Sequence, residues 1–168
     1  MSEDQLTYRK LMGRFVTGVA VIGFSGPDGP LGMTVNSLTS VSLDPLLLLF
    51  CVRKRGRSLG HLKRARRFSV NILASGQEDV SRHFAGAVIE GLPVDWRALE
   101  DCPILQGCTA SFACRLSALH PAGDHTIVLG RVLDMDGAGE APAPLIYYAG
   151  RYGLSAFGQT PSHHSMKG

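Results

Sequence analysis

Hydrophobic and polar positions along the chain fall into short runs that are separated by glycine, proline and aspartate. This pattern is typical of antiparallel strands joined by turns, and helical spacing is limited to three short segments. The turn signal at residues 26–30 predicts that the first two strands form a hairpin, whereas residues 86–103 show little regular pattern. Strands are predicted at about residues 18–24, 31–40, 46–53, 68–73, 109–119, 126–135 and 145–148, and helices at about 4–16, 58–66 and 77–85.

These elements predict a mainly β fold, for which an antiparallel barrel is economical because closure removes exposed strand edges. The chain has 168 residues, of which 45% are hydrophobic, the size and composition of one globular domain. Twenty glycines and nine prolines agree with many turns. We expect a single domain over residues 1–157 and a mobile tail over residues 158–168.

The amino-terminal residues and the cysteines bear on location. Residues 1–15 carry five charged side chains and no apolar segment, so no signal peptide is expected. The apolar run at 46–52 is far shorter than the roughly 20 residues of a membrane helix. The four cysteines have no zinc-binding spacing, and no three histidines or carboxylates have ligand spacing, so we expect no metal site. Reduced thiols in a cytoplasmic protein are the simplest interpretation.

The most polar stretch with strand-like flanks is residues 32–42, directly before the apolar run. A buried hydroxyl or amide without a partner costs roughly 1–3 kcal/mol, so this stretch is a poor core strand and a better surface for a polar ligand. An ordinary Ser/Thr-rich edge strand or turn is the alternative. Its six short hydrogen-bonding side chains are Thr34, Asn36, Ser37, Thr39, Ser40 and Ser42.

Positive charge is concentrated in one segment, although the net charge is only +3. Eight of the seventeen basic residues lie between Arg53 and Arg67, with no acid among them. The segment turns at Gly56 and enters a helix that Ser58 can cap, and a helix start beside arginines suits a phosphate. The alternatives are a solvated charged face or a nucleic-acid patch. Nucleic acid is not expected, because aromatic residues and a second basic stripe are lacking.

A histidine opens one of the apolar strands, in the stretch Gly123-Asp124-His125-Thr126. There, a neutral His125 could hydrogen-bond a ligand while Asp124 holds its tautomer, and a structural turn histidine is the alternative. The chain has no GxSxG elbow, Walker lysine motif or Rossmann GxGxxG. If the protein is an enzyme, a bound organic cofactor would therefore supply the reactivity.

Several short blocks, in this order, resemble the flavin reductase-like family of split-barrel, flavin-binding proteins. The resemblance runs from about Tyr8 to Tyr152, and it is greatest to the small reductase components of two-component flavin-dependent monooxygenases. It implies an antiparallel split β-barrel with Greek-key strand order and a few short flanking helices. The blocks are Phe15-Val16-Thr17-Gly18-Val19, Gly32-Met33-Thr34-Val35-Asn36-Ser37, Ser40-Val41-Ser42-Leu43-Asp44-Pro45, Phe68-Ser69-Val70-Asn71-Ile72-Leu73, Phe84-Ala85 and Gly123-Asp124-His125-Thr126-Ile127.

The resemblance also implies ligands and site residues. FMN or FAD would be the flavin, NADH or NADPH the hydride donor, and a monooxygenase the recipient of reduced flavin. A homodimer with the flavin near the subunit interface is implied as well. His125 would lie on the nicotinamide side as the catalytic residue. The implied cofactor-binding residues are Met33, Thr34, Val35, Asn36, Ser37, Ser40, Val41 and Ser42 at the flavin, Arg57 and Ser58 at its phosphate, Ser69, Val70 and Asn71 along the same groove, and, by a C-terminal family feature, Arg151 and Tyr152.

The mechanism implied by this resemblance is hydride transfer from the nicotinamide C4 to the flavin N5. Such a step depends on how the two rings are oriented and needs little acid–base chemistry from side chains. Two other functions stay open at this point. One is a non-catalytic flavin- or haem-binding module on the same barrel, and the other is a basic interaction domain that binds nucleic acid through residues 53–67.

Overall fold

The computed structural model describes residues 1–137, 139 and 142–153, so the predicted tail lies outside the described residues. No helix within these ranges is long and apolar enough to cross a membrane. The elements in chain order are α1 (Glu3–Met12), β1 (Thr17–Gly18), β2 (Ala20–Gly26), β3 (Gly29–Val35), β4 (Thr39–Leu43), β5 (Leu46–Arg53), α2 (Arg57–Ala65), β6 (Arg67–Ile72), α3 (Glu78–Phe84), β7 (Trp96–Leu99), β8 (Cys102–Leu105), β9 (Ala110–Ala122), β10 (His125–Asp136), β11 (Ile146–Tyr148) and β12 (Arg151–Gly153).

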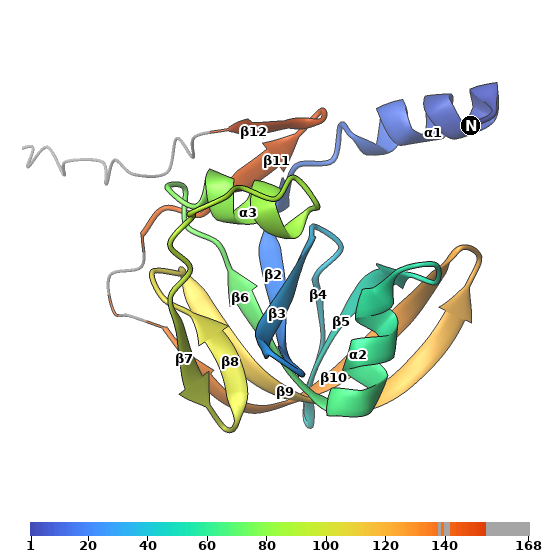
Figure 1. The fold of residues 1–168 in the computed structure, drawn as a ribbon. Coiled ribbons are helices and arrows are strands. Elements are labelled where there is room, and N and C mark those ends of the chain that lie inside the picture. Colours follow the sequence, from blue (N-terminus) through green and yellow to red (C-terminus); the bar gives the residue numbers. More distant parts are fainter. Residues whose placement is uncertain (138, 140–141, 154–168) are drawn as a thin grey trace, which may run out of the picture.

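Seven strands form one antiparallel sheet in the order β3-β2-β6-β9-β10-β5-β4 (Figure 1). The prediction of a mainly β, split-barrel fold with a few helices is confirmed. The sheet is not closed into a continuous barrel, because β3 and β4 are its two edges. Only residues 36–38 separate these edges in the chain, so the split in the barrel is spanned by a short polar link.

Two smaller sheets complete the architecture. β1, β11 and β12 form one, and β7 pairs with β8 in the other. The β7–β8 hairpin lies in the segment predicted to be irregular. Its turn places Glu100 and Asp101 in the left-handed region, at φ 48° and 61°. That conformation favours glycine or asparagine, so the sequence offers no hairpin signal there.

The core lies between the large sheet and α2. Phe50 and Phe68 meet edge to face with ring centroids 5.3 Å apart, and Leu62 of α2 is fully buried against the same cluster. Gly130 of β10 allows this packing, because a Cβ there would come within 2.5 Å of the Phe68 ring. A second cluster, around Leu73, packs beneath α3.

The helices differ from their predicted bounds in ways that matter for the site. α2 begins at Arg57 with Gly56 as its N-cap, so the expectation that Ser58 caps this helix is wrong. α1 ends at Met12, four residues earlier than predicted, and has no buried residue. A capping box between Ser2 and Gln5 stabilises its start. Figure 1 shows α1 reaching outward from the sheet.

Candidate functional site

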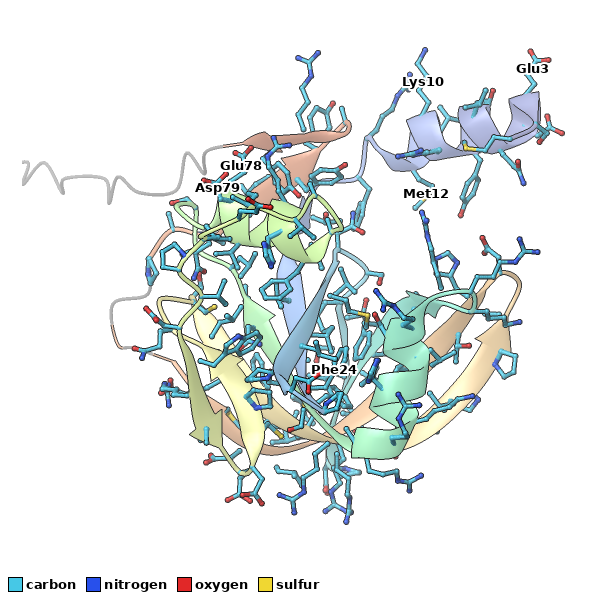
Figure 2. All side chains as sticks on the ribbon, viewed as in Figure 1. Glu3, Lys10, Met12, Phe24, Glu78 and Asp79 are labelled. Carbon is cyan, nitrogen blue, oxygen red and sulfur yellow. The ribbon has the colours of Figure 1, made fainter. Side chains whose placement is uncertain are left out.

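A cavity of about 910 Å³ lies between α1, the start of β2 and the link between β3 and β4. This volume is near the top of the range of about 300–1,000 Å³ that is typical of small-molecule sites. One part of its wall is apolar and another is polar, and Figure 2 shows Met12 pointing from α1 toward the body of the protein. The apolar part comprises Phe15, Val16, Val19, Leu38 and Ile72, and the polar part Asn36, Ser37, Thr39 and His125.

Three of the short polar side chains of residues 32–42 form hydrogen bonds within the protein. Thr34 Oγ1 donates to the Ser81 carbonyl at 2.7 Å, and Ser37 Oγ accepts from the Cys51 amide at 3.0 Å. Ser42 Oγ accepts from the amide two residues further on, at 3.2 Å. These bonds fix the two edges of the split, so the three side chains serve the fold.

The remaining polar side chains of this stretch are free. Within the described residues, Asn36, Thr39 and Ser40 make no side-chain hydrogen bond, and all three are exposed. Asn36 and Thr39 line the cavity, whereas Ser40 follows in β4 beside a β-bulge that leaves Val41 46% exposed. The link therefore offers free donors and acceptors at the cavity wall.

His125 reaches the cavity from the first position of β10, where it pairs with Arg53 of β5. Its Nδ1 lies 2.7 Å from Asp124 Oδ1. The preceding turn is held by Lys54, whose amide donates to the Asp124 carbonyl at 3.0 Å and whose Nζ donates to the Gly123 carbonyl at 2.6 Å. The histidine is thus fixed from both the carboxylate and the turn.

The charge on Asp124 determines which nitrogen of His125 is available. The hydrogen bond from His125 lowers the pKa of Asp124 from its ordinary value, and the positive charge of Arg53 adds to this effect. The carboxylate is therefore an acceptor at neutral pH, and Nδ1 is the donor. Among the described residues Nε2 has no partner, so it is the nitrogen left for a ligand.

Arg57 and Ser58 do not line the cavity. They form the first turn of α2, where Gly56 is extended and no side chain caps the free amides. Arg57 is exposed and has no acidic partner within the described ranges. Free amides and a guanidinium suit an anion, although this position is separate from the cavity wall.

The side chains of Ser69, Val70 and Asn71, which the resemblance implies along the groove, are buried and do not line the cavity. All three are 0% exposed. The Asn71 amide donates to Ser69 Oγ and a β2 carbonyl, and accepts from the Leu105 amide and Ser111 Oγ, at 2.8–3.0 Å. These four bonds use the full capacity of the side chain, so it joins strands and has none left for a ligand.

Two residues of β3 are likewise turned toward the protein. Val35 is only 8% exposed within the main core, and Met33 packs against the same cluster. Neither lines the cavity. Any ligand contact at these two positions would have to use backbone groups.

Tyr152 ties the β11–β12 hairpin to α3. Its hydroxyl lies 2.9 Å from Ser81 Oγ, and the Arg82 guanidinium carbon is 5.0 Å from its ring centroid. Its ring also meets the ring of Tyr147 at 5.2 Å. Tyr147 lines the cavity, but Arg151 and Tyr152 do not. Tyr152 thus packs against a cavity residue without lining the cavity itself.

Among the cavity residues that the sequence did not identify, three come from α1. Thr39, by contrast, is one of the six polar side chains of residues 32–42 that the sequence singled out, and it does line the cavity. Tyr8, Arg9 and Met12 lie on α1, and with Gly13 their spacing places them on one helix face. That spacing is visible in the sequence, but the apolar residues Leu6 and Leu11 predict a different face of the helix as the one that packs against the protein.

The described residues contain no group of three or more metal-binding side chains. The four cysteines are free. Burial raises the pKa of Cys108 to about 11 and that of Cys114 to about 12, so both thiols are protonated at neutral pH. Neither is suited to act as a nucleophile.

Comparison with known proteins agrees with this geometry. The family model described as "Flavin reductase like domain" matches residues 12–154. The chain belongs to the flavin reductase-like family. The matched range contains every strand of the split barrel and every residue that lines the cavity except Tyr8 and Arg9.

Individual relatives share this family. The chain is 36% identical over 167 residues to the reductase subunit HsaB of a flavin-dependent monooxygenase from Mycobacterium tuberculosis, covering 95% of this chain and 88% of that protein. It is 38% identical over 154 residues to the FMN reductase (NADH) SmoA of Agrobacterium fabrum, covering 90% and 86%. A probable flavin reductase from Rhizobium meliloti is 43% identical over 139 residues, 81% of this chain, which spans only 45% of that longer protein.

The fold is shared with solved structures as well. The flavin reductase PheA2 superposes with a TM-score of 0.85 at 32% identity, covering 93% of this chain and 99% of that one. The split barrel and its flanking helices are thus those of a flavin reductase.

Proposed function

We propose that this protein is an NAD(P)H-dependent flavin reductase that supplies reduced flavin to a partner monooxygenase. The observation that carries the proposal is the cavity, in which free polar side chains of the β3–β4 link and the open Nε2 of His125 face an apolar wall. Relatives named FMN reductase (NADH) and reductase subunit of a flavin-dependent monooxygenase support it.

The cavity residues fit a flavin. An isoalloxazine ring is flat and apolar on its faces and polar along one edge, and it would therefore use both kinds of wall. Phe15, Val16 and Leu38 can cover a ring face, while Asn36 and Thr39 can bond its polar edge. When bound, the flavin supplies the ring that accepts a hydride from the nicotinamide.

The chain contributes orientation and no obligatory proton transfer. We assign His125 to hold the nicotinamide carboxamide through Nε2, with Asp124 fixing the imidazole by its 2.7 Å bond to Nδ1. The protein would accelerate the reaction mainly by holding the nicotinamide ring against the flavin, because hydride transfer requires the two rings in near-attack geometry. Backbone amides near Ser40 and Ser42 would favour negative charge on reduced flavin.

A phosphate subsite at the start of α2 is part of the proposal. Arg57 and the uncapped amides of the first turn would bind the flavin phosphate, with Ser58 adding a hydroxyl. The seven other basic residues between Arg53 and Arg67 would raise the local concentration of anionic flavin and nucleotide.

We also propose a homodimer in the cytoplasm. Large apolar side chains are exposed on α1, in the segment that follows it and along the β4 edge, among them Leu43 at 84% and Phe15 at 70%. Exposed apolar groups beside an open sheet edge favour pairing with another chain. Because Phe15 also lines the cavity, such an interface would lie beside the ligand.

The deciding experiment follows NADH and NADPH oxidation by the purified protein with FMN, FAD or riboflavin, with protein-free controls. We expect flavin-dependent consumption, and the Asn36→Ala variant should need more flavin to reach half-maximal rate. If no donor–flavin pair is consumed while flavin still binds, the protein is a non-catalytic binding module. If neither flavin nor nucleotide binds, the site assignment fails altogether.

A further inference from the structure

α1 contributes to the cavity without contributing to the core. None of its ten residues is buried, yet Tyr8, Arg9 and Met12 line the cavity wall. The end of the helix is anchored, because the Ala149 amide donates to the Gly13 carbonyl at 2.8 Å. The helix is therefore held in place next to a ligand-sized space, and its inward face is available to a ligand.

The inward face carries a charge that the rest of the wall does not balance. No aspartate or glutamate lines the cavity within the described ranges, and Arg9 is the one lysine or arginine that does. Arg9 has no ion pair with a described residue. A guanidinium that faces a cavity without a carboxylate partner is well suited to an anionic ligand, and its planar fork matches phosphate.

An aromatic ring adjoins this charge. Tyr8 is 69% exposed and lines the same cavity. Aromatic rings stack on nucleobases of any sequence, because every base has a π-face. Figure 2 shows Lys10, the next residue along the helix, pointing away from the body of the protein. A phosphate binder and a stacking ring thus share one face, and the neighbouring cation does not.

We propose that Tyr8 and Arg9 form a subsite for the ADP group of a bound dinucleotide. Tyr8 would stack on the adenine and Arg9 would bond the phosphate on the adenosine side, at the α1 wall of the cavity. This inference rests on the proposed function. Both NADH and FAD carry an ADP group, so the shared chemistry defines the subsite and the experiment distinguishes the two sources.

The first test is the binding of 5′-ADP alone, measured by calorimetry without flavin or turnover. We expect Arg9→Ala and Tyr8→Ala each to weaken binding about tenfold, equivalent to about 1.4 kcal/mol. Lys10→Ala removes one positive charge from the same helix and should bind like the parent protein. Because no α1 residue is buried, all three variants should keep the parent circular dichroism spectrum and unfolding midpoint.

The second test compares ligands with and without the ADP group. If the group belongs to the donor, Arg9→Ala raises KM for NADH and leaves KM for dihydronicotinamide mononucleotide unchanged. If it belongs to the flavin, the same variant weakens FAD and leaves FMN unchanged. Either result supports the subsite.

Three results overturn it. They are parent protein that does not bind ADP, Arg9→Ala and Lys10→Ala variants that bind ADP equally, and a change in dimer mass in Arg9→Ala without a change in ADP affinity. The last would show that the α1 face meets a second copy of the chain. A parent protein that binds ADP but oxidises no nucleotide would refute the reductase function and leave the subsite standing.

Discussion

At the scale of single residues, His125 has one ring nitrogen bonded to Asp124 and the other open to the cavity. His125→Ala should therefore raise KM for NADH about tenfold, the worth of one ligand hydrogen bond, while the flavin Kd changes little. Steady-state kinetics and flavin fluorescence titration measure the two quantities. Asp124→Asn should give a smaller effect of the same kind. Equal losses of both affinities would contradict the nicotinamide assignment.

Arg57 provides a second residue-level prediction, because a guanidinium beside uncapped helix amides recognises phosphate. Arg57→Ala should weaken FMN and FAD about tenfold and leave riboflavin nearly unchanged, since riboflavin lacks phosphate. Lys63→Ala, in the last turn of the same helix, is the matched control for charge and should weaken FMN and FAD much less than Arg57→Ala does. A uniform loss across the three flavins would rule out the phosphate assignment.

Asn71 shows what the sequence could not reveal about single residues. An asparagine in a strand beside other polar residues has the composition of a ligand-binding position. Its hydrogen-bond partners lie 34–50 residues away along the chain, apart from Ser69, so only the folded sheet shows that they satisfy it. Asn36 and His125 could be predicted because they follow polar and turn signals that are local.

The Asn71 network itself predicts a loss of stability. Asn71→Ala would leave buried donors and acceptors of β2, β8 and β9 without partners, at a cost of about 3 kcal/mol in the free energy of unfolding. Urea denaturation of the variant measures this directly. Asn36→Ala, an exposed amide, is the control and should unfold like the parent protein. A loss below about 1 kcal/mol for Asn71→Ala would mean that water replaces the network.

At the scale of elements, β5 has the bounds that the sequence predicted, because its apolar run ends abruptly in charge at one end and follows Asp44-Pro45 at the other. The β7–β8 hairpin was missed, since its turn uses Glu100 and Asp101 in a conformation typical of glycine. Local sequence signals thus locate a strand when charged residues or proline stand at its ends. A turn that the surrounding structure imposes on ordinary residues cannot be recognised from the sequence in this way.

The packing of β10 against β6 depends on one glycine. A Cβ at Gly130 would lie 2.5 Å from the Phe68 ring, so Gly130→Ala should lower the free energy of unfolding by about 1–3 kcal/mol through overpacking. A thermal melt reports the change. Gly18→Ala, where a Cβ meets nothing within 4 Å, should leave the melting temperature unchanged. Equal melting temperatures for both variants would show that the ring moves aside freely.

At the scale of the whole molecule, the open sheet leaves β4 as an unpaired edge with Leu43 exposed. The proposed dimer predicts a mass near twice that of the chain by light scattering. Leu43→Asp should lower the dimer fraction at a given concentration, because a charge would be buried in the interface. Val88→Asp alters another exposed apolar side chain and should not. A parent protein that is monomeric at every concentration would refute the dimer.

The general architecture was accessible from the sequence, since alternation, turns and the order of family blocks all lead to a split barrel. The cavity was only partly accessible. Most of its polar wall is one continuous stretch of chain, to which the distant His125 is added, whereas its α1 wall lies beside residues about thirty positions away along the chain. No periodicity within α1 records which face will meet that wall.

The absence of buried residues on α1 has an evolutionary consequence. Mutations on this helix change the wall of the cavity at almost no risk to folding, whereas mutations in the sheet face the close packing of the core. Nucleotide preference could therefore drift among descendants through a few surface positions near the amino terminus. For protein engineers, the same helix is a place where substitutions can be combined without disturbing the core. Libraries of variants at Tyr8, Arg9 and Met12 would test how these side chains set the preference for one ligand over another.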